Sequence, residues 1–286
     1  MMHPVMKNLF EPVENTHFEW CVLETKESVE ELFATGEYQE TEERILNALF
    51  DYRYLNRYNL TRLVGRGDIK KHLDKMLSQG IIGEYVLTDH AGNRQENTLI
   101  VYQLSKKADS YLLEVKKRER GYRRNNTPSE DEIYKTLSMN QYHIGMVLEN
   151  KDKILSHSVH FCDTYREMGT VHIPSLIILK NHLSLIGLPM ARRDEDFTAQ
   201  IRTLLKLAGY LKEKELEHRF PFIIWVASSN RAVIEGMEKV RRIKELQNIP
   251  VAYILDYNTK SGNPVHQIYT AKQKGENRTE LGRVML

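Results

Sequence analysis

The most informative stretch of the chain is TRLVGRGDIKKHLDKMLSQGIIGEYVLTD, residues 61–89. Asp68 is a favourable helix N-cap, and the apolar residues after it recur at helical spacing. Gly80 ends this helix, because glycine tolerates backbone angles that other residues avoid. A β-prone run, 81–88, follows directly. The stretch therefore predicts an amphipathic helix that leads into a strand. The apolar face of the helix consists of Ile69, Leu73, Met76 and Leu77.

Two more helices and a second strand surround this stretch. Residues 39–49 carry Ile45, Leu46 and Leu49 at helical spacing, and a short helix over 59–63 ends at Gly65. On the other side, residues 89–93 suit a hairpin loop, and residues 96–104 form another β-prone run. Three helices followed by a β-hairpin is the element order of a winged helix-turn-helix.

A winged helix binds double-stranded DNA by placing its third helix in the major groove, while the hairpin tip touches the neighbouring backbone or minor groove. We expect Arg66, near the start of that helix, to reach a base edge, and the lysines to contact phosphates. The alternative is a protein-interaction adaptor whose lysines form an ordinary solvated face. The expected DNA-contacting residues are Arg57, Arg66, Lys70, Lys71, Lys75, His90, Asn93 and Arg94.

The second half of the chain predicts an α/β domain with a mixed sheet. Helical spacing of apolar residues covers 130–150 and 194–217, and a third helix runs from Ser228 or Ser229 to residue 247. The broad apolar face of helix 194–217 indicates core packing or a dimer seam. A homodimer would suit a DNA-binding protein, because paired half-sites require paired subunits. The expected strands are 156–164, 170–179, 182–188, 222–227 and 251–255.

These elements give a domain plan for the 286 residues. We expect an N-terminal extension over 1–38 and a winged helix over 39–115. A basic and polar linker over 116–131 separates it from the α/β domain over 132–257, which would dimerise or hold a protein partner. The last segment, 258–286, is expected to be a polar tail.

Composition excludes several classes of protein. A net charge of +2 gives no global positive field, so any DNA site must be a local patch. The two cysteines lie far apart and outside any zinc-type spacing, which indicates a reduced, cytoplasmic setting. The N-terminus lacks the pattern of a signal peptide, and no apolar run approaches membrane-helix length. Because no P-loop, GxSxG or HExxH motif occurs, we expect no cofactor and no metal.

Several segments together resemble the plasmid replication-relaxation family, over roughly Glu40 to Leu255. The resemblance implies an N-terminal winged helix and a C-terminal domain similar to restriction endonucleases. The segments are 45–49 with Tyr54-Leu55, Leu73-Met76-Leu77 before Gly80, 101–105, His143-Ile144-Gly145, Ile173-Pro174-Ser175, and 221–227 followed by Ser229-Asn230-Arg231.

The chain departs from a working nuclease of that type. Such an enzyme needs an Asp and a Glu-x-Lys on adjoining strands to hold a divalent metal. Here the corresponding segments read Pro174-Ser175 and 187–192, GLPMAR, and neutral side chains cannot replace two carboxylates. We therefore expect a protein that is not an enzyme and that recognises a DNA sequence, as a transcriptional regulator or an accessory factor in replication or transfer.

Two catalytic alternatives use other residues. A metal-dependent nuclease would recruit carboxylates from non-standard positions, and the candidates are Asp163, Asp194, Glu195 and Asp196. A relaxase would need clustered histidines beside a tyrosine, for which His157, His160 and His172 with Tyr165 are the nearby candidates. Because His157 and His160 are three residues apart in an expected strand, they should point to opposite faces.

Overall fold

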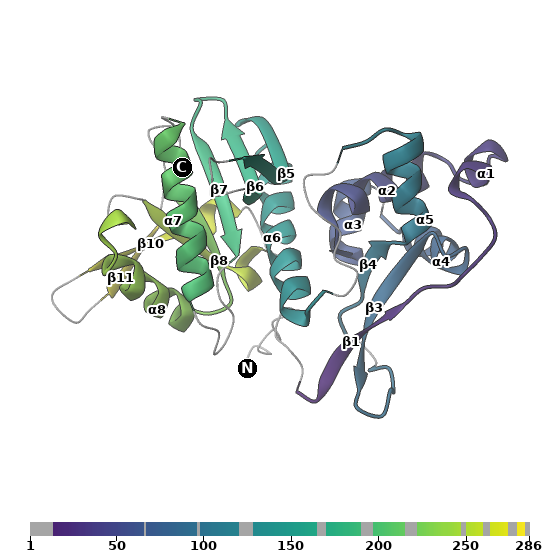
Figure 1. Ribbon diagram of the computed structural model, residues 1–286, viewed down its shortest axis with the longest axis horizontal. Helices are drawn as coiled ribbons and strands as arrows, with labels where there is room; N and C mark the ends of the chain where they lie inside the picture. The colour runs from purple at the N-terminus through teal and green to yellow at the C-terminus, as the bar shows by residue number, and fades with distance from the viewer. Residues whose placement is uncertain are drawn as a thin grey trace. The chain divides into compact units, whose positions relative to one another are not determined.

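A computed structural model describes residues 14–65, 67–95, 98–119, 128–164, 170–189, 197–214, 222–246, 250–259, 264–273 and 279–283. The chain divides into two compact units (Figure 1). The N-terminal unit is Pro12–Ile133, and the C-terminal unit contains Tyr134–Leu286. Each unit has mixed α/β structure and its own sheet.

The N-terminal unit contains a four-stranded antiparallel sheet in the order β1-β3-β4-β2. The strands are β1 (Thr16–Cys21), β2 (Leu55–Asn56), β3 (Ile82–Asp89) and β4 (Val101–Leu104). Its helices are α1 (Val29–Ala34), α2 (Glu40–Tyr52), α3 (Arg57–Val64), α4 (Lys70–Ser78) and α5 (Lys106–Ser110), the last continuing as one π-helical turn, Tyr111–Val115.

The local sequence explains these helix ends. Gln39 and Glu42 form a capping box at the start of α2, and Ile45, Leu46 and Leu49 are buried on its inner face. Gly65 ends α3 with φ 73°, a left-handed conformation that favours glycine. Helices α2, α3 and α4 and the β3–β4 pair thus lie where the sequence predicts them.

The first 38 residues contain more structure than the expected extension. Strand β1 pairs with β3 and α1 precedes α2, and both belong to the N-terminal unit. The Trp20 ring packs on Tyr85 with centroids 4.7 Å apart. It also covers Gly83, where an added Cβ would come within 2.4 Å of the indole. Glycine at this position therefore lets β1 close over the hairpin.

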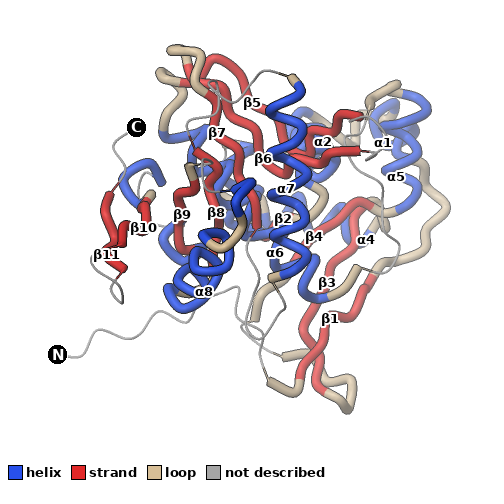
Figure 2. Tube along the Cα trace, turned by 60° about the vertical axis from the view of Figure 1, so that its left-hand side comes forward, coloured by secondary structure: helices blue, strands red, loops and turns tan. Residues whose placement is uncertain are grey.

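The C-terminal unit is built on a seven-stranded sheet in the order β11-β10-β9-β8-β7-β6-β5 (Figure 2). Strands β7, β8 and β9 run parallel, and all other neighbours are antiparallel. The strands are β5 (Ile154–Thr164), β6 (Thr170–Leu179), β7 (Ser184–Pro189), β8 (Phe222–Ala227), β9 (Val251–Leu255), β10 (Tyr269–Gln273) and β11 (Thr279–Arg283). Strands β10 and β11 fall in the segment expected to be a tail.

Helices cover both faces of this sheet. The helix α6 (Glu130–Glu149) packs Met139, Tyr142 and Met146 against one core. The other core lies under α7 (Thr198–Glu213) and α8 (Asn230–Arg241). The apolar face of α7, including Leu204, Leu207 and Leu211, is buried in this core, so core packing explains the breadth of that face. Among the described helices, none is long and apolar enough to cross a membrane.

Candidate nucleic-acid interface

The turn from α3 into α4 presents two lysines to solvent. Asp68 lies in this turn, and its Oδ1 accepts a hydrogen bond of 2.9 Å from the backbone N–H of Lys70. Lys70 and Lys71 are exposed on the first turn of α4, and neither forms an ion pair with another described residue. Asp74 is exposed one turn later, so the charge of this helix face is mixed. Arg66, the expected base-reading residue, lies outside the described residues.

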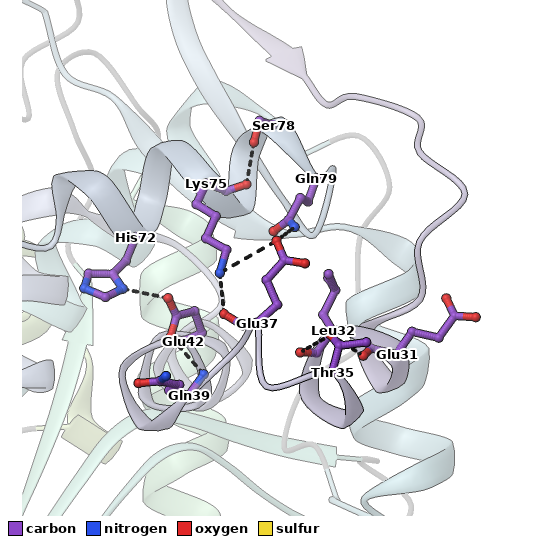
Figure 3. A network of polar contacts seen from close by, with 10 residues as sticks. All are labelled: Glu31, Leu32, Thr35, Glu37, Gln39, Glu42, His72, Lys75, Ser78 and Gln79. Carbon is purple, nitrogen blue, oxygen red and sulfur yellow. Dashed lines mark hydrogen bonds and ion pairs between the residues drawn. The ribbon is translucent and has the colours of Figure 1, made fainter.

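Lys75, expected to contact DNA, instead binds groups of its own protein (Figure 3). Its Nζ donates to the backbone carbonyl of Glu37 and lies 3.8 Å from that residue's carboxylate. It also lies 5.0 Å from the centre of the Tyr38 ring. These contacts tie α4 to the segment between α1 and α2. Helical spacing could not reveal them, because the partners are nearly forty residues earlier in the chain.

A second contact between α4 and α2 lies beside Lys75. His72 Nδ1 is 2.6 Å from Glu42 Oε1, and the Gln39 N–H donates to Glu42 Oε2 (Figure 3). Burial acts to raise the pKa of the Glu42 carboxyl, but the hydrogen bonds from His72 and Gln39 outweigh it and lower the pKa below its usual value. Glu42 is therefore an ionised, buried anchor for α4.

Two expected phosphate-binding arginines are held by carboxylates at the surface. Arg57 lies 3.3 Å from Asp68, and Arg94 lies 2.9 Å from Glu84. Both guanidinium groups are about half exposed, so a phosphate could take over either one. Exposed ion pairs of this kind contribute little to stability. These arginines therefore remain available for an anionic partner.

The loop between β3 and β4 is organised by Asp89. Its carboxylate accepts hydrogen bonds from the N–H groups of Ala91 and Asn93 and from the Asn93 side chain. Backbone and side-chain donors from Asn93 lower the pKa of Asp89. His90 stacks on His17 of β1, with centroids 6.5 Å apart. Asn93 thus shapes the loop tip, while His90 stays exposed beside β1.

In the C-terminal unit, two positions in the segments compared above with nuclease motifs, Ser175 and Gly187, are closely packed. Ser175 of β6 pairs directly with Gly187 of β7. An added Cβ at Gly187 would lie 2.8 Å from Met139 and 2.9 Å from both Ser175 and Tyr142. Around these two positions there is consequently no room for a pair of carboxylates and a metal ion.

A histidine of α6 completes this cluster. His143 Nδ1 lies 2.8 Å from the Ser175 hydroxyl, and its Nε2 lies 3.1 Å from His157 Nδ1. Burial, with the neighbouring His157 and His160, lowers the pKa of His143 to about 3. The sequence showed His143 and Ser175 separately, but only the folded sheet brings them together. The cluster is thus a neutral, hydrogen-bonded part of the core.

The other catalytic candidates are dispersed. His160 stacks on His172, with ring centroids 5.3 Å apart, and lies near enough to His143 to help lower the pKa of that residue. Asp163 accepts a hydrogen bond of 2.8 Å from the Tyr210 hydroxyl. Asp194, Glu195, Asp196 and Tyr165 lie outside the described residues. Within the described ranges, no three His, Cys, Asp or Glu side chains form a group that could hold a metal ion.

Comparison with known proteins yields no relative: the chain matches no family model, no curated protein and no solved structure. Its function must therefore be inferred from its own geometry.

Proposed function

We propose that the N-terminal unit is a winged helix-turn-helix that binds double-stranded DNA, and that the protein recognises a DNA sequence as a regulator or as an accessory factor in replication or transfer. The observation that carries this proposal is the place of β2. This short strand lies between α2 and α3 in the chain and pairs with β4, next to β3. A helix, strand, helix, helix and hairpin in this order is the plan of a winged helix.

The exposed start of α4 is the centre of the proposed interface. Lys70 and Lys71 project from the helix that would enter the major groove, where they would contact phosphates. Arg57 and Arg94 would leave their carboxylate partners and bind the backbone at either side. Lys75 does not belong to this set, because its ammonium group holds α4 to the Glu37 segment.

The C-terminal unit is proposed as a non-catalytic scaffold for a second subunit or a protein partner. The order α6-β5-β6-β7-α7-β8-α8-β9, with an antiparallel β5-β6-β7 and a parallel β7-β8-β9, supports the resemblance to restriction endonucleases. The packing of Met139 and Tyr142 on Gly187 supports the loss of a metal site. Through this resemblance, a plasmid or other mobile element is the proposed genetic context.

The test is a salt series of binding to two duplexes, one of random sequence and one from upstream of the protein's own coding sequence. We expect tighter binding to the upstream duplex. For Lys70→Ala/Lys71→Ala, the slope of log affinity against log salt should fall by about 0.9 for each phosphate that the variant no longer binds. Lys106→Ala is the control, because Lys106 is an exposed lysine of the same unit on α5.

Two results would contradict the proposal. One is the absence of binding to either duplex at low salt by a protein whose circular dichroism shows that it is folded. The other is an equal loss of affinity from the Lys106 control and from the Lys70/Lys71 variant, which would indicate non-specific charge attraction. The first result would favour an interaction adaptor.

A further inference from the structure

A pocket of about 330 Å³ lies in the C-terminal unit, between the beginning of β6, the end of β7 and the first turns of α7. Its interior is apolar, and Val171, Leu188, Leu207 and Trp225 contribute to the lining. This volume is in the range of pockets that hold small organic molecules. Neither Ser175 nor Gly187 lines this pocket, although their neighbours Pro174 and Leu188 do.

Positive charge gathers at this pocket from two helices. Lys135 of α6 and Lys206 of α7 both line it, and the described lining residues include neither Asp nor Glu. Lys206 is half-buried, and its Nζ donates to the Thr170 carbonyl oxygen at 2.5 Å. That bond fixes the ammonium group at the pocket and leaves it two further N–H donors.

An acceptor lies at the same pocket. Gln200 of α7 lines it, and the Gln200 Oε1 atom is buried with no hydrogen-bond partner among the described residues. A buried amide oxygen without a donor is unfavourable, and a ligand with an N–H or O–H group would satisfy it. The pocket thus combines two cations, one acceptor and an apolar interior.

We infer that this pocket binds a small organic phosphate with a ring that carries N–H donors, the chemistry of a nucleoside monophosphate. A phosphate monoester is an anion with several acceptor oxygens, and the ammonium groups of Lys135 and Lys206, which line the pocket, can donate hydrogen bonds to them. The ring would enter the apolar interior and donate to Gln200. This inference does not depend on the DNA-binding proposal, because every residue that it uses belongs to the C-terminal unit.

The experiment is titration calorimetry of the full chain, without DNA, with each of the four ribonucleoside 5′-monophosphates. We expect at least one to bind with a stoichiometry of one. Its parent nucleoside and inorganic phosphate should each bind at least about tenfold more weakly, since each lacks one half of the recognised chemistry. Lys135→Gln/Lys206→Gln should weaken the nucleotide by a similar factor. The control is Lys212→Gln, an exposed lysine of α7 outside the pocket lining.

A second variant tests the pocket without changing its charge. Ala199 is exposed and lines the pocket, so Ala199→Phe should fill the space and abolish binding while the chain stays folded. The inference is overturned if none of the four nucleotides binds at millimolar concentration. It is also overturned if binding survives both the lysine double variant and Ala199→Phe unchanged.

Discussion

The Nδ1 atom of His143 lies 2.8 Å from the hydroxyl oxygen of Ser175, and neither residue is exposed to solvent. This contact joins α6 to the middle of β6, beside Gly187 of β7. A buried polar pair is tolerated because each partner satisfies the other, and removal of one leaves an unfavourable buried group. The core at this point therefore combines close packing with neutral hydrogen bonding.

Substitution of Gly187 should destabilise the C-terminal unit. In Gly187→Ala the new methyl group would lie within 2.9 Å of Ser175 and Tyr142, so buried neighbours must shift. Overpacking of this kind costs about 1–3 kcal/mol. Urea unfolding followed by Trp225 fluorescence, in a Trp20→Phe background, would measure this loss of unfolding free energy. Gly67→Ala, in the N-terminal unit and with nothing within 4 Å of the added Cβ, should leave this transition unchanged.

The low pKa of His143 should make the C-terminal unit sensitive to acid. Burial holds this pKa at about 3, below its usual value of 6.5, so the unfolded chain binds the proton more readily. Above pH 6.5, His143 is mostly neutral in both the folded and the unfolded chain, so it does not make the free energy of unfolding depend on pH. Between pH 6.5 and about 3, one such group lowers the free energy of unfolding by up to about 1.4 kcal/mol per pH unit.

His143→Gln isolates this effect. The variant should be less stable at pH 7, because it disturbs the contact with Ser175, but its stability should change less between pH 6.5 and 4 than that of the parent chain. His266→Gln replaces an exposed histidine of the same unit and should keep the parent's pH dependence. Parallel pH profiles for all three proteins would rule out His143 as the acid-sensitive group.

The sequence predicted elements whose signals are local. Helices α2 and α4 and strands β8 and β9 follow from periodicity within a few residues. The predicted cap of α4 was wrong, because Ile69 and not Asp68 occupies the N-cap position and no side chain caps the helix. Strand β1 was missed although Phe18 and Trp20 alternate with exposed residues, because its partner β3 begins more than sixty residues later. Strand β2 has only two residues, too few for any period, and its existence depends on pairing with β4.

The candidate site shows the same division. Exposure of Lys70 and Lys71 agrees with their place on the polar side of a helix. The role of Lys75 depends on the folded position of Glu37, which lies far away in the sequence. The spacing of residues within the helix does not predict this contact. The closed cluster of His143, Ser175 and Gly187 likewise depends on the β6–β7 register and on the approach of α6.

Glu42 should stabilise the N-terminal unit only while it is ionised. Hydrogen bonds from His72 and Gln39 hold its pKa below the usual 4.5, despite burial, so this stability is present above pH 4.5 and is lost as pH falls through the folded pKa. At pH 7, Glu42→Gln should cost about 1–2 kcal/mol. Trp20 fluorescence in a Trp225→Phe background reports the transition. Glu43→Gln is the control, because Glu43 is an exposed neighbour on the same helix. If Glu42→Gln costs as much stability at pH 3 as at pH 7, the stabilisation does not come from the ionised carboxylate.

Lys71 and Lys75 should separate DNA binding from stability, although they lie on the same helix. Lys75→Ala removes a bond to the Glu37 carbonyl and the contact with the Tyr38 ring, so the N-terminal unit should lose about 1 kcal/mol of stability. The salt slope of DNA binding should stay nearly constant. Lys71→Ala should leave stability within about 0.5 kcal/mol and lower the slope by about 0.9, because an exposed lysine gives up only its bond to a phosphate. The reverse pattern, with Lys75 controlling the slope and Lys71 the stability, would show that the bonded lysine turns outward when DNA binds.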